Sequence, residues 1–154
     1  MIEIRRLTPG DVAVARRLFT LMSTVFGDEA SPLGDAYLAR LLERQDFWAI
    51  AASIEGELVG GLTAHTLPMT RSESSEIFIY DIAVREACQR RGIGRTLMTA
   101  VREMAAAEGI HELFVPADNE DTHALAFYRA LGGAGSAVTI FDFPSGSGAP
   151  DAPR

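Results

Sequence analysis

The chain has 154 residues, a length typical of one domain that can bury its own core. All 14 basic residues are arginine, and the lack of lysine excludes a Schiff base with pyridoxal phosphate, a Walker phosphate loop and a protein-kinase nucleotide clamp. The formal net charge of −7 disfavours nucleic acid or an anionic membrane as partner and suits cationic ligands. A single cysteine, Cys88, excludes an internal disulfide framework and a thiolate metal site.

The first third of the chain predicts one strand followed by two helices. Residues 2–7 have the pattern of a short strand. A helix should then begin at Thr8, with a proline in its first position and Asp11 in its third, and run to about Val25. Residues 35–44 predict a second short helix after a Gly- and Pro-containing turn.

The rest of the chain alternates strands and helices. Apolar strands flank the turn at Glu55–Glu57 and predict a hairpin, and residues 67–75 predict a loop. The almost continuously apolar segment Glu76–Val84 predicts a strand buried on both faces, in which Asp81 is the anomaly. The remaining expected elements are a helix from Gly92 to about Glu108 that stops at Gly109, a strand at 111–117, a helix at 122–131 and a last strand at 136–143. This order predicts a single mixed α/β domain over residues 1–143 and a flexible tail over 144–154.

The chemistry-bearing motif is Gln89-Arg90-Arg91-Gly92-Ile93-Gly94, between a strand and a long helix. The first N–H groups of a helix lack partners and carry partial positive charge, and glycines allow a ligand to approach the backbone. Arg90, Arg91 and Arg95 add formal charge, so the turn suits a pyrophosphate. A dinucleotide fingerprint would need a small residue where Leu97 stands, and a plain connecting turn would leave the arginines unexplained.

These residues carry a family resemblance. The motif resembles the Q/R-x-x-G-x-G/A pyrophosphate loop of the GNAT superfamily of N-acetyltransferases, and Asn119 with Ala124–Tyr128 and Leu131-Gly132 resembles its second motif. Within the superfamily, the chain is similar to type I aminoglycoside 3-N-acetyltransferases. Their likeness is carried by Phe26-Gly27-Asp28, by the string Ser75–Val84, and by Ala117-Asp118 running on to Asp121.

The resemblance implies a mostly antiparallel mixed sheet with splayed central strands, flanked by about four helices, and acetyl-CoA as the acetyl donor bound in the gap between the strands. The residues expected to bind it are Ile82, Ala83, Val84, Gln89, Arg90, Arg91, Gly92, Ile93, Gly94, Arg95, Thr96, Asn119, Ala124 and Tyr128. Of these, Ile82 and Val84 would pair with the pantetheine arm through their backbone groups.

Transfer of an acetyl group to an amine requires that the protonated amine lose a proton and that the leaving thiolate gain one. Asp81 is the candidate base, although it could instead lie at the sheet edge and pair with an arginine. Tyr128 is the candidate proton donor to the sulfur, and Tyr80 could orient the amine; packing is the competing interpretation for both tyrosines. Cys88 precedes the phosphate loop, far from the expected thioester, which disfavours a covalent acetyl-cysteine.

A polycationic amine needs carboxylates around its site, because aminoglycosides carry several ammonium groups. The candidate substrate-binding residues are Asp28, Glu76, Tyr80, Asp81, Asp118, Glu120, Asp121 and Asp142. Any single carboxylate could be an ordinary surface charge, and Asp118 and Asp121 could simply cap the following helix. No metal site is expected, since His65 and His111 lack a ligand pattern.

The sequence departs from the resembled pattern at Pro116, where the family has Gln, and at Thr122-His123, where it has Asp-Pro. These changes leave open a GNAT enzyme for polyamines, sugar amines or peptide N-termini, and, in another class, a non-catalytic acyl-CoA-binding domain. The N-terminal segment lacks the apolar stretch of a signal peptide, which predicts a cytoplasmic protein. The last strand and the 67–75 loop offer edges for a homodimer.

Overall fold

The computed structural model describes residues 1–29 and 31–146. The chain divides into two compact units, Met1–Pro116 and Ala117–Arg154. In chain order the elements are β1 Ile2–Arg6, the 3-10 turn η1 Pro9–Asp11, α1 Val12–Phe26, α2 Asp35–Glu43, β2 Phe47–Ile54, β3 Glu57–Pro68, β4 Ser75–Val84, the 3-10 turn η2 Glu86–Cys88, α3 Ile93–Ala107, β5 Glu112–Phe114 and α4 Thr122–Ala130.

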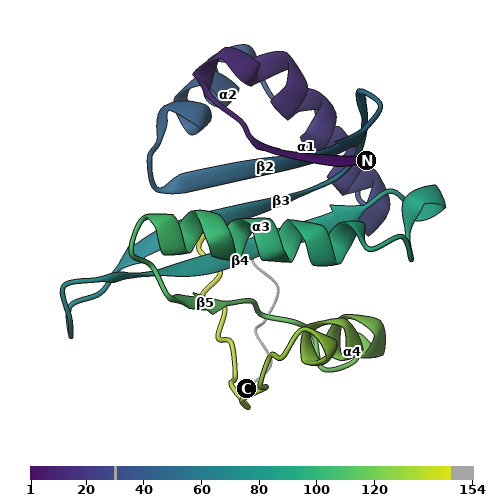
Figure 1. The fold of residues 1–154 in the computed structure, drawn as a ribbon. Coiled ribbons are helices and arrows are strands. Elements are labelled where there is room, and N and C mark those ends of the chain that lie inside the picture. Colours follow the sequence, from purple (N-terminus) through teal and green to yellow (C-terminus); the bar gives the residue numbers. More distant parts are fainter. Residues whose placement is uncertain (30, 147–154) are drawn as a thin grey trace. The chain divides into compact units, whose positions relative to one another are not determined.

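The first unit is built on one five-stranded sheet in the order β1-β2-β3-β4-β5 (Figure 1). The first four strands are antiparallel, whereas β5 runs parallel to β4 and is reached through α3. Glu55 and Gly56 connect β2 to β3 with φ values of 50° and 81°, the left-handed pair that a tight two-residue hairpin requires. The hairpin and the mixed α/β fold predicted from the sequence are therefore confirmed.

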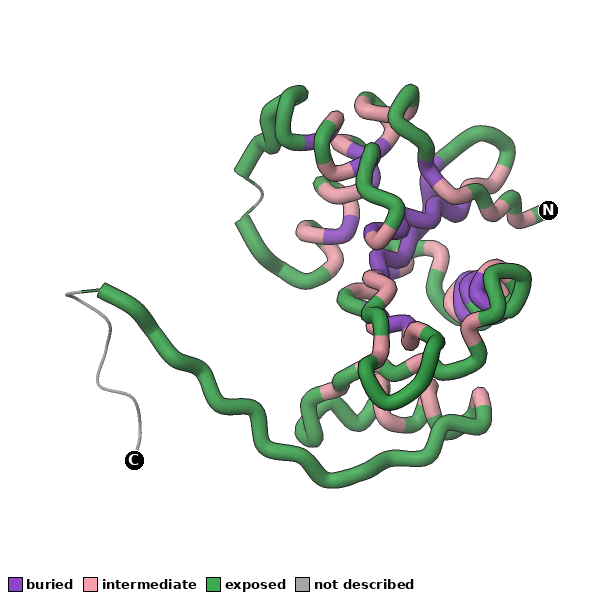
Figure 2. Tube along the Cα trace, turned by 90° about the vertical axis from the view of Figure 1, so that its left-hand side faces the viewer, coloured by how far each residue is buried: buried purple, intermediate pink, exposed green. Residues whose placement is uncertain are grey.

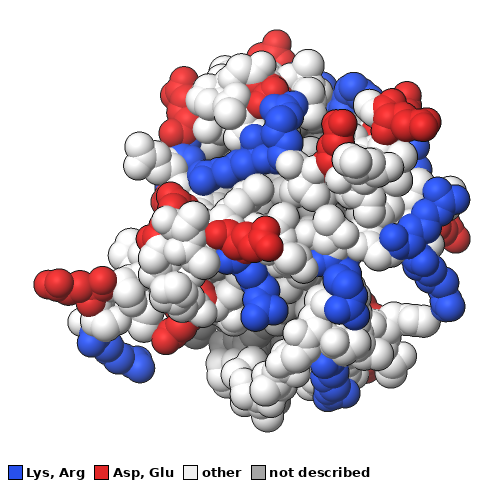
Figure 3. Space-filling view, in the orientation of Figure 1, with Lys and Arg blue, Asp and Glu red and all other residues white. Residues whose placement is uncertain are grey.

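Helices cover both faces of this sheet. One face packs on α1 and α2, because Phe47, Ala49, Ala51 and Ala83 share a buried cluster with Leu18 of α1 and its neighbours. Strand residues point alternately to the two faces, so Trp48, Ile50 and Leu62 lie on the other face, with α3. Figure 2 shows the purple core concentrated in the sheet and the adjoining helices. On the face bearing α3, acidic and arginine side chains are interspersed (Figure 3).

The predicted helix start at Thr8 is confirmed, with a short 3-10 turn ahead of α1. The Thr8 backbone N–H and hydroxyl both donate to Oδ2 of Asp11, at 2.7 and 2.9 Å. Arg5 donates to the same oxygen at 2.8 Å, and its hydrogen bond, followed by that of the Thr8 backbone, lowers the pKa of Asp11 to about 2. This carboxylate ties the end of β1 to the start of α1.

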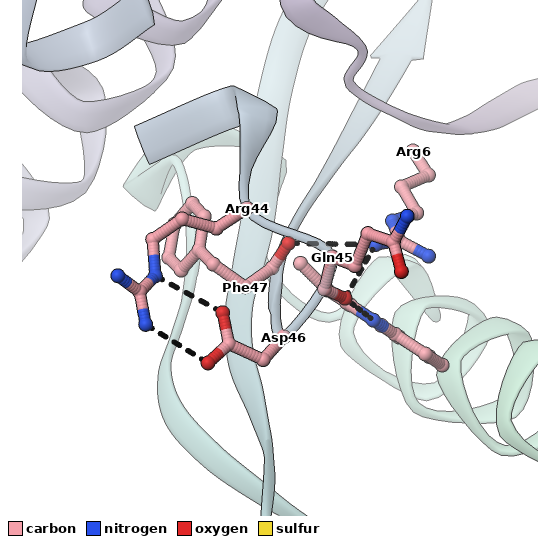
Figure 4. Close-up of polar contacts among 6 residues, drawn as sticks. Arg6, Arg44, Gln45, Asp46 and Phe47 are labelled. Atoms are coloured by element: carbon pink, nitrogen blue, oxygen red, sulfur yellow. Dashed lines mark hydrogen bonds and ion pairs between the residues drawn. The ribbon is translucent and has the colours of Figure 1, made fainter. Parts of the chain in front are cut away.

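Arginines also fasten the start of β2 (Figure 4). The guanidinium of Arg6 lies 4.5 Å from the centre of the Trp48 ring and donates to the Gln45 carbonyl at 3.3 Å. The Trp48 indole donates to the same carbonyl at 3.3 Å. Arg44 holds Asp46 through two parallel hydrogen bonds of 3.0 and 2.9 Å. These contacts give β2 a fixed entry into the core.

Three sequence-based predictions about strands are wrong. Residues 136–143 form no strand, and Val138, Ile140, Phe141 and Phe143 are all exposed. The strand expected at 111–117 shrinks to β5, which ends before Pro116, a residue without a donor N–H. The strand at 76–84 is not buried on both faces, because Tyr80 is 62% exposed. The tail expected at 144–154 falls outside the described residues from 147 onward.

Candidate active site

The parallel strands β4 and β5 diverge after a short paired segment. They pair over three positions and stop at Phe78 with Phe114, whereas β4 continues to Val84. Beyond Phe78, the β4 edge that faces away from β3 has no β5 partner. This is the splayed arrangement that the sequence resemblance implies, and it leaves a strand edge whose backbone groups can pair with an extended ligand.

The register of β3 fixes which β4 backbone groups face this open edge. The Arg85 N–H donates to the Val59 carbonyl at 2.7 Å, and hydrogen-bonded positions alternate along an antiparallel pair. Ala83 is therefore bonded toward Gly61 of β3, whereas Ile82 and Val84 present their backbone groups to the open edge. The expected roles of Ile82 and Val84 fit this geometry. The backbone of Ala83 is already used by the sheet, so its inclusion among the ligand-binding residues is not supported.

A glutamine side chain within the turn after β4 holds this turn closed. Gln89 Nε2 donates to the Val84 carbonyl at 3.0 Å, which folds the 89–92 segment back on the strand end. Arg90 and Gly92 both adopt left-handed backbone conformations, with φ values of 66° and 80°. Turns in which left-handed residues alternate with ordinary ones direct successive N–H groups into one concave surface, which suits an anion.

The N-terminus of α3 adds further donors to the same surface. Its first internal hydrogen bond runs from the Thr96 N–H to the Gly92 carbonyl, at 2.9 Å, so the N–H groups of Ile93, Gly94 and Arg95 precede the helical ladder. A Cβ on Gly92 would meet no atom within 4 Å, which means that the backbone borders open space. Arg90, Arg91 and Arg95 are exposed beside it. These residues fit a pyrophosphate.

Thr96 itself departs from the sequence-based expectation. Both its N–H and its hydroxyl donate to the Gly92 carbonyl, at 2.9 and 2.8 Å. Its donors are therefore committed to starting the helix and do not point to a ligand. The anion surface is made by the residues before it.

A β-bulge in the middle of β4 determines the sheet face to which Asp81 points. Phe78 pairs with His65 and Asp81 with Thr63, so two residues that are three apart on β4 oppose two residues that are two apart on β3. Tyr80 is the extra residue, and the bulge puts Asp81 on the same face as Phe78, where strict alternation would have turned it away. This face is the one that carries α1 and α2, since Ala83 belongs to their cluster.

A second carboxylate approaches Asp81 from α1. Gly27, with φ 76°, ends α1: its N–H bonds the Thr24 carbonyl, and the Asp28 N–H bonds the Ser23 carbonyl at 2.9 Å, closing a Schellman motif. Partial burial raises the pKa of Asp81, and the neighbouring charge of Asp28 raises it further. Among the described residues, Asp81 takes part in no ion pair with an arginine, so the alternative of a paired edge carboxylate is not supported.

An aromatic row, which sequence reasoning missed, crosses the strands beside Asp81. Phe47 on β2 lies 5.3 Å from His65 on β3, measured between ring centres, and His65 lies 5.8 Å from Tyr80 on β4. Phe78 is 5.7 Å from Tyr80 and stacks on Phe114 of β5 at 5.1 Å, with 15° between the ring planes. The strands β2 to β5 each contribute one or two members, so no local sequence pattern reveals the row; only the strand register does.

The second unit holds the remaining candidate residues. Asp121 accepts a hydrogen bond from the Ala124 N–H at 3.0 Å, which makes it the cap of α4, and Asp118 accepts from the Glu120 N–H at 3.0 Å. The capping interpretation is thus confirmed for Asp121, whereas Asp118 closes the turn that precedes α4. Tyr128 lies half-buried on α4, with its ring 5.2 Å from that of Phe127. Asn119, Glu120 and Asp142 are exposed outside the helix.

Other kinds of site find little support. Within residues 1–29 and 31–146, His, Cys, Asp and Glu form no group of three or more that could hold a metal ion. Within the same ranges, no helix is long and apolar enough to cross a membrane. Cys88 is partly exposed in the turn before Gln89.

Known proteins resemble this chain in sequence and fold. The Acetyltransferase (GNAT) family matches residues 15–132. An aminoglycoside acetyltransferase from an uncultured soil metagenomic sample is 39% identical, with 95% of this chain and 99% of that chain covered and a TM-score of 0.90. A second soil metagenomic aminoglycoside acetyltransferase, solved with sisomicin, is 34% identical, with 94% and 97% covered and a TM-score of 0.90.

A more distant neighbour shows the fold alone. AAC(6')-Iy, solved with a bisubstrate analogue that contains CoA, is 19% identical, with 94% of this chain and 99% of that chain covered and a TM-score of 0.79. No curated protein matches the sequence. The family match over most of the chain, the splayed strands and the anion-suited turn at 89–95 agree, and the chain therefore belongs to the GNAT acetyltransferase family, whose members use acetyl-CoA.

Proposed function

We propose that the protein transfers the acetyl group of acetyl-CoA to the 3-amino group of aminoglycosides by direct transfer in a ternary complex, which would inactivate these antibiotics in the cytoplasm. The single observation that carries the proposal is the carboxylate pair Asp81 and Asp28, set beside the open β4 edge on the α1 and α2 face. A polycationic amine is the substrate that such a pair attracts. The 39% and 34% identical relatives described as aminoglycoside acetyltransferases support this substrate class.

Acetyl-CoA supplies an activated acetyl thioester when bound. The anion surface formed by the N–H groups of residues 93–95 and the arginines at 90, 91 and 95 would hold its pyrophosphate. The backbone of Ile82 and the N–H of Val84 would pair with its amide groups, because these face the open edge. Binding at this end of β4 thus requires few particular side chains.

Asp81 would remove a proton from the bound ammonium group. Its raised pKa makes the carboxylate a stronger base than an ordinary surface aspartate, while Asp28 offers a second negative charge to hold the cation. Tyr128 is proposed as the hydrogen-bond donor to the leaving sulfur, on the strength of its place in the second family motif. Tyr80, which is exposed at the bulge, would border the amine.

The test is a purified-enzyme assay of CoA thiol release with acetyl-CoA and gentamicin, sisomicin, spermidine or a short peptide, followed by NMR of the acetylated product. The proposal expects turnover with the aminoglycosides and a new acetamide at the 3-amino group. Acetylation at another amine would overturn the regiochemistry alone. Turnover confined to spermidine or peptides would overturn the substrate class, and binding of CoA without any turnover would indicate a non-catalytic domain.

A further inference from the structure

The exposed end of the aromatic row forms an apolar surface next to the carboxylate pair, with the Tyr80 ring edge-on to the stacked rings of Phe78 and Phe114. We define this aromatic shelf as Phe78, Tyr80 and Phe114; Tyr80 is 62% exposed and Phe114 is 42% exposed. Both rings contact Phe78, and the two members of the row nearer the core, Phe47 and His65, support the shelf from β2 and β3. Large aromatic side chains that stay exposed in one contiguous group mark a binding surface.

Carboxylates lie at both ends of the shelf. Asp81 and Asp28 stand at one end. At the other end, Glu76 pairs in register with Glu112 on β5, and both point to the shelf face because each precedes a shelf phenylalanine by two residues. With about 3.3 Å per residue, the two ends are roughly 15 Å apart along β4. Like charges opposed across two strands cost stability unless a cation lies between or above them.

This layout distinguishes ring-bearing amines from linear ones. A saturated sugar or cyclitol ring can lay its C–H face on an aromatic ring, and an ammonium substituent can contact the ring face and the carboxylates beyond it. A linear polyamine satisfies the carboxylates equally well, but it has no ring to cover the aromatic surface. The negative ends and the apolar middle therefore match an elongated polycation built of rings.

We infer that the aromatic shelf is a specificity subsite that selects ring-bearing polyamines over linear ones, with Phe114 as its outermost contact. This inference rests on the proposed function, since it describes how the same amine site chooses its substrate. Asp81 and Asp28 receive the reacting end of the substrate, and Glu76 with Glu112 receives a distant ammonium group. Phe114 touches the substrate ring between them and takes no part in proton transfer.

The experiment compares three variants by steady-state kinetics with sisomicin, with spermidine as a competitor. Phe114→Leu removes the ring but keeps an apolar side chain, Phe114→Tyr keeps the ring, and Leu113→Ala weakens the same strand from its opposite face. We expect Phe114→Leu to raise KM for sisomicin about 3- to 10-fold with kcat and the KM for acetyl-CoA little changed. Phe114→Tyr should restore the wild-type KM, and the inhibition constant of spermidine should change less than about twofold.

Several outcomes would overturn the shelf. They are an unchanged KM in Phe114→Leu, an equal rise in Leu113→Ala, or an equal loss of spermidine affinity. If sisomicin is not acetylated, calorimetric titration of sisomicin into the CoA-bound enzyme separates the two claims. If the wild type binds sisomicin and Phe114→Leu binds it more weakly, the shelf is supported and the proposed function is contradicted. If the wild type does not bind sisomicin, both are contradicted.

Discussion

The two ends of the open β4 edge offer different chemical groups to the ligands proposed for them. At the Val84 end, the groups available to a ligand are backbone N–H donors, fixed by the left-handed Gly92 and the start of α3. Near the middle of the strand, the groups are side chains: Asp81 at the bulge, Asp28 after α1 and the aromatic shelf. One strand thus carries a donor site set by chain geometry and an acceptor site set by residue identity.

This difference explains why the assignment of the family and the proposal of a substrate class rest on different parts of the site. Backbone recognition needs only a glycine, a short turn and a helix start, which many sequences provide while binding the same pyrophosphate. Side-chain recognition changes with each substitution, so relatives with the same fold can take different amines. Variants at the two ends should therefore damage different kinetic constants.

The largest effect is expected at the bulge. Asp81→Asn removes the proposed proton acceptor but keeps the side-chain size, so kcat should fall about 10²- to 10⁴-fold. The dissociation constant of acetyl-CoA, measured by calorimetry, should stay within about twofold, because this variant leaves the turn at 89–95 intact. Unchanged turnover would remove Asp81 from the mechanism, and a parallel loss of acetyl-CoA binding would break the separation between the two ends.

Tyr128→Phe tests the proposed donor on α4. Loss of the hydroxyl should lower kcat by about 10- to 100-fold, at the lower end of the range for a lost acid or base, since solvent can partly replace it. Single-turnover rates and thermal unfolding measured together are the check. A lower unfolding temperature with an unchanged chemical step would show that Tyr128 only packs.

Of the two substrates, Gly92→Ala should affect the binding of acetyl-CoA alone. A left-handed alanine costs about 1–2 kcal/mol of folding stability. Its Cβ also enters the open space in front of the turn, so the affinity for CoA should fall about tenfold. Gly109→Ala is the matched control: it has a similar φ of 77° at the other end of the same helix. It should lose comparable stability but keep its CoA affinity. Equal losses of CoA binding would mean that the turn has no special role.

The smallest effect is a displacement in pH. Burial is the main cause of the raised pKa of Asp81, and the charge of Asp28 is the second cause. Asp28→Asn removes that like charge and lowers the pKa of Asp81, so the acidic limb of the pH profile of kcat/KM should move to lower pH. Glu29→Gln, which changes the net charge equally one residue away, should leave the limb in place. A limb that stays fixed in Asp28→Asn would uncouple the two carboxylates.

Local patterns predicted most of the elements. Helices with apolar positions at regular spacing, such as α1 and α3, and the hairpin at Glu55–Gly56 were readable because their signals lie within a few neighbouring residues. The turn at 89–95, which is proposed to bind the pyrophosphate, was predicted for the same reason. The capping role of Asp121 followed from its position just before α4.

Features that depend on strand register could not be predicted from the sequence. The bulge at Tyr80 turns Asp81 to another face, and nothing within β4 announces it, because the shift is defined against β3. The aromatic row joins residues as distant in sequence as Phe47 and Phe114. The strand expected at 136–143 failed in the opposite way: its alternation was suitable, but a strand also needs a partner.

A crystal structure of the ternary complex with CoA and sisomicin tests the proposed mechanism most directly. It should show the pyrophosphate on the N–H groups of residues 93–95 and the Asp81 carboxylate about 2.6–3.2 Å from the sisomicin amine nearest the thiol. An empty turn at 89–95, or an Asp81 side chain directed away from that amine, would contradict it.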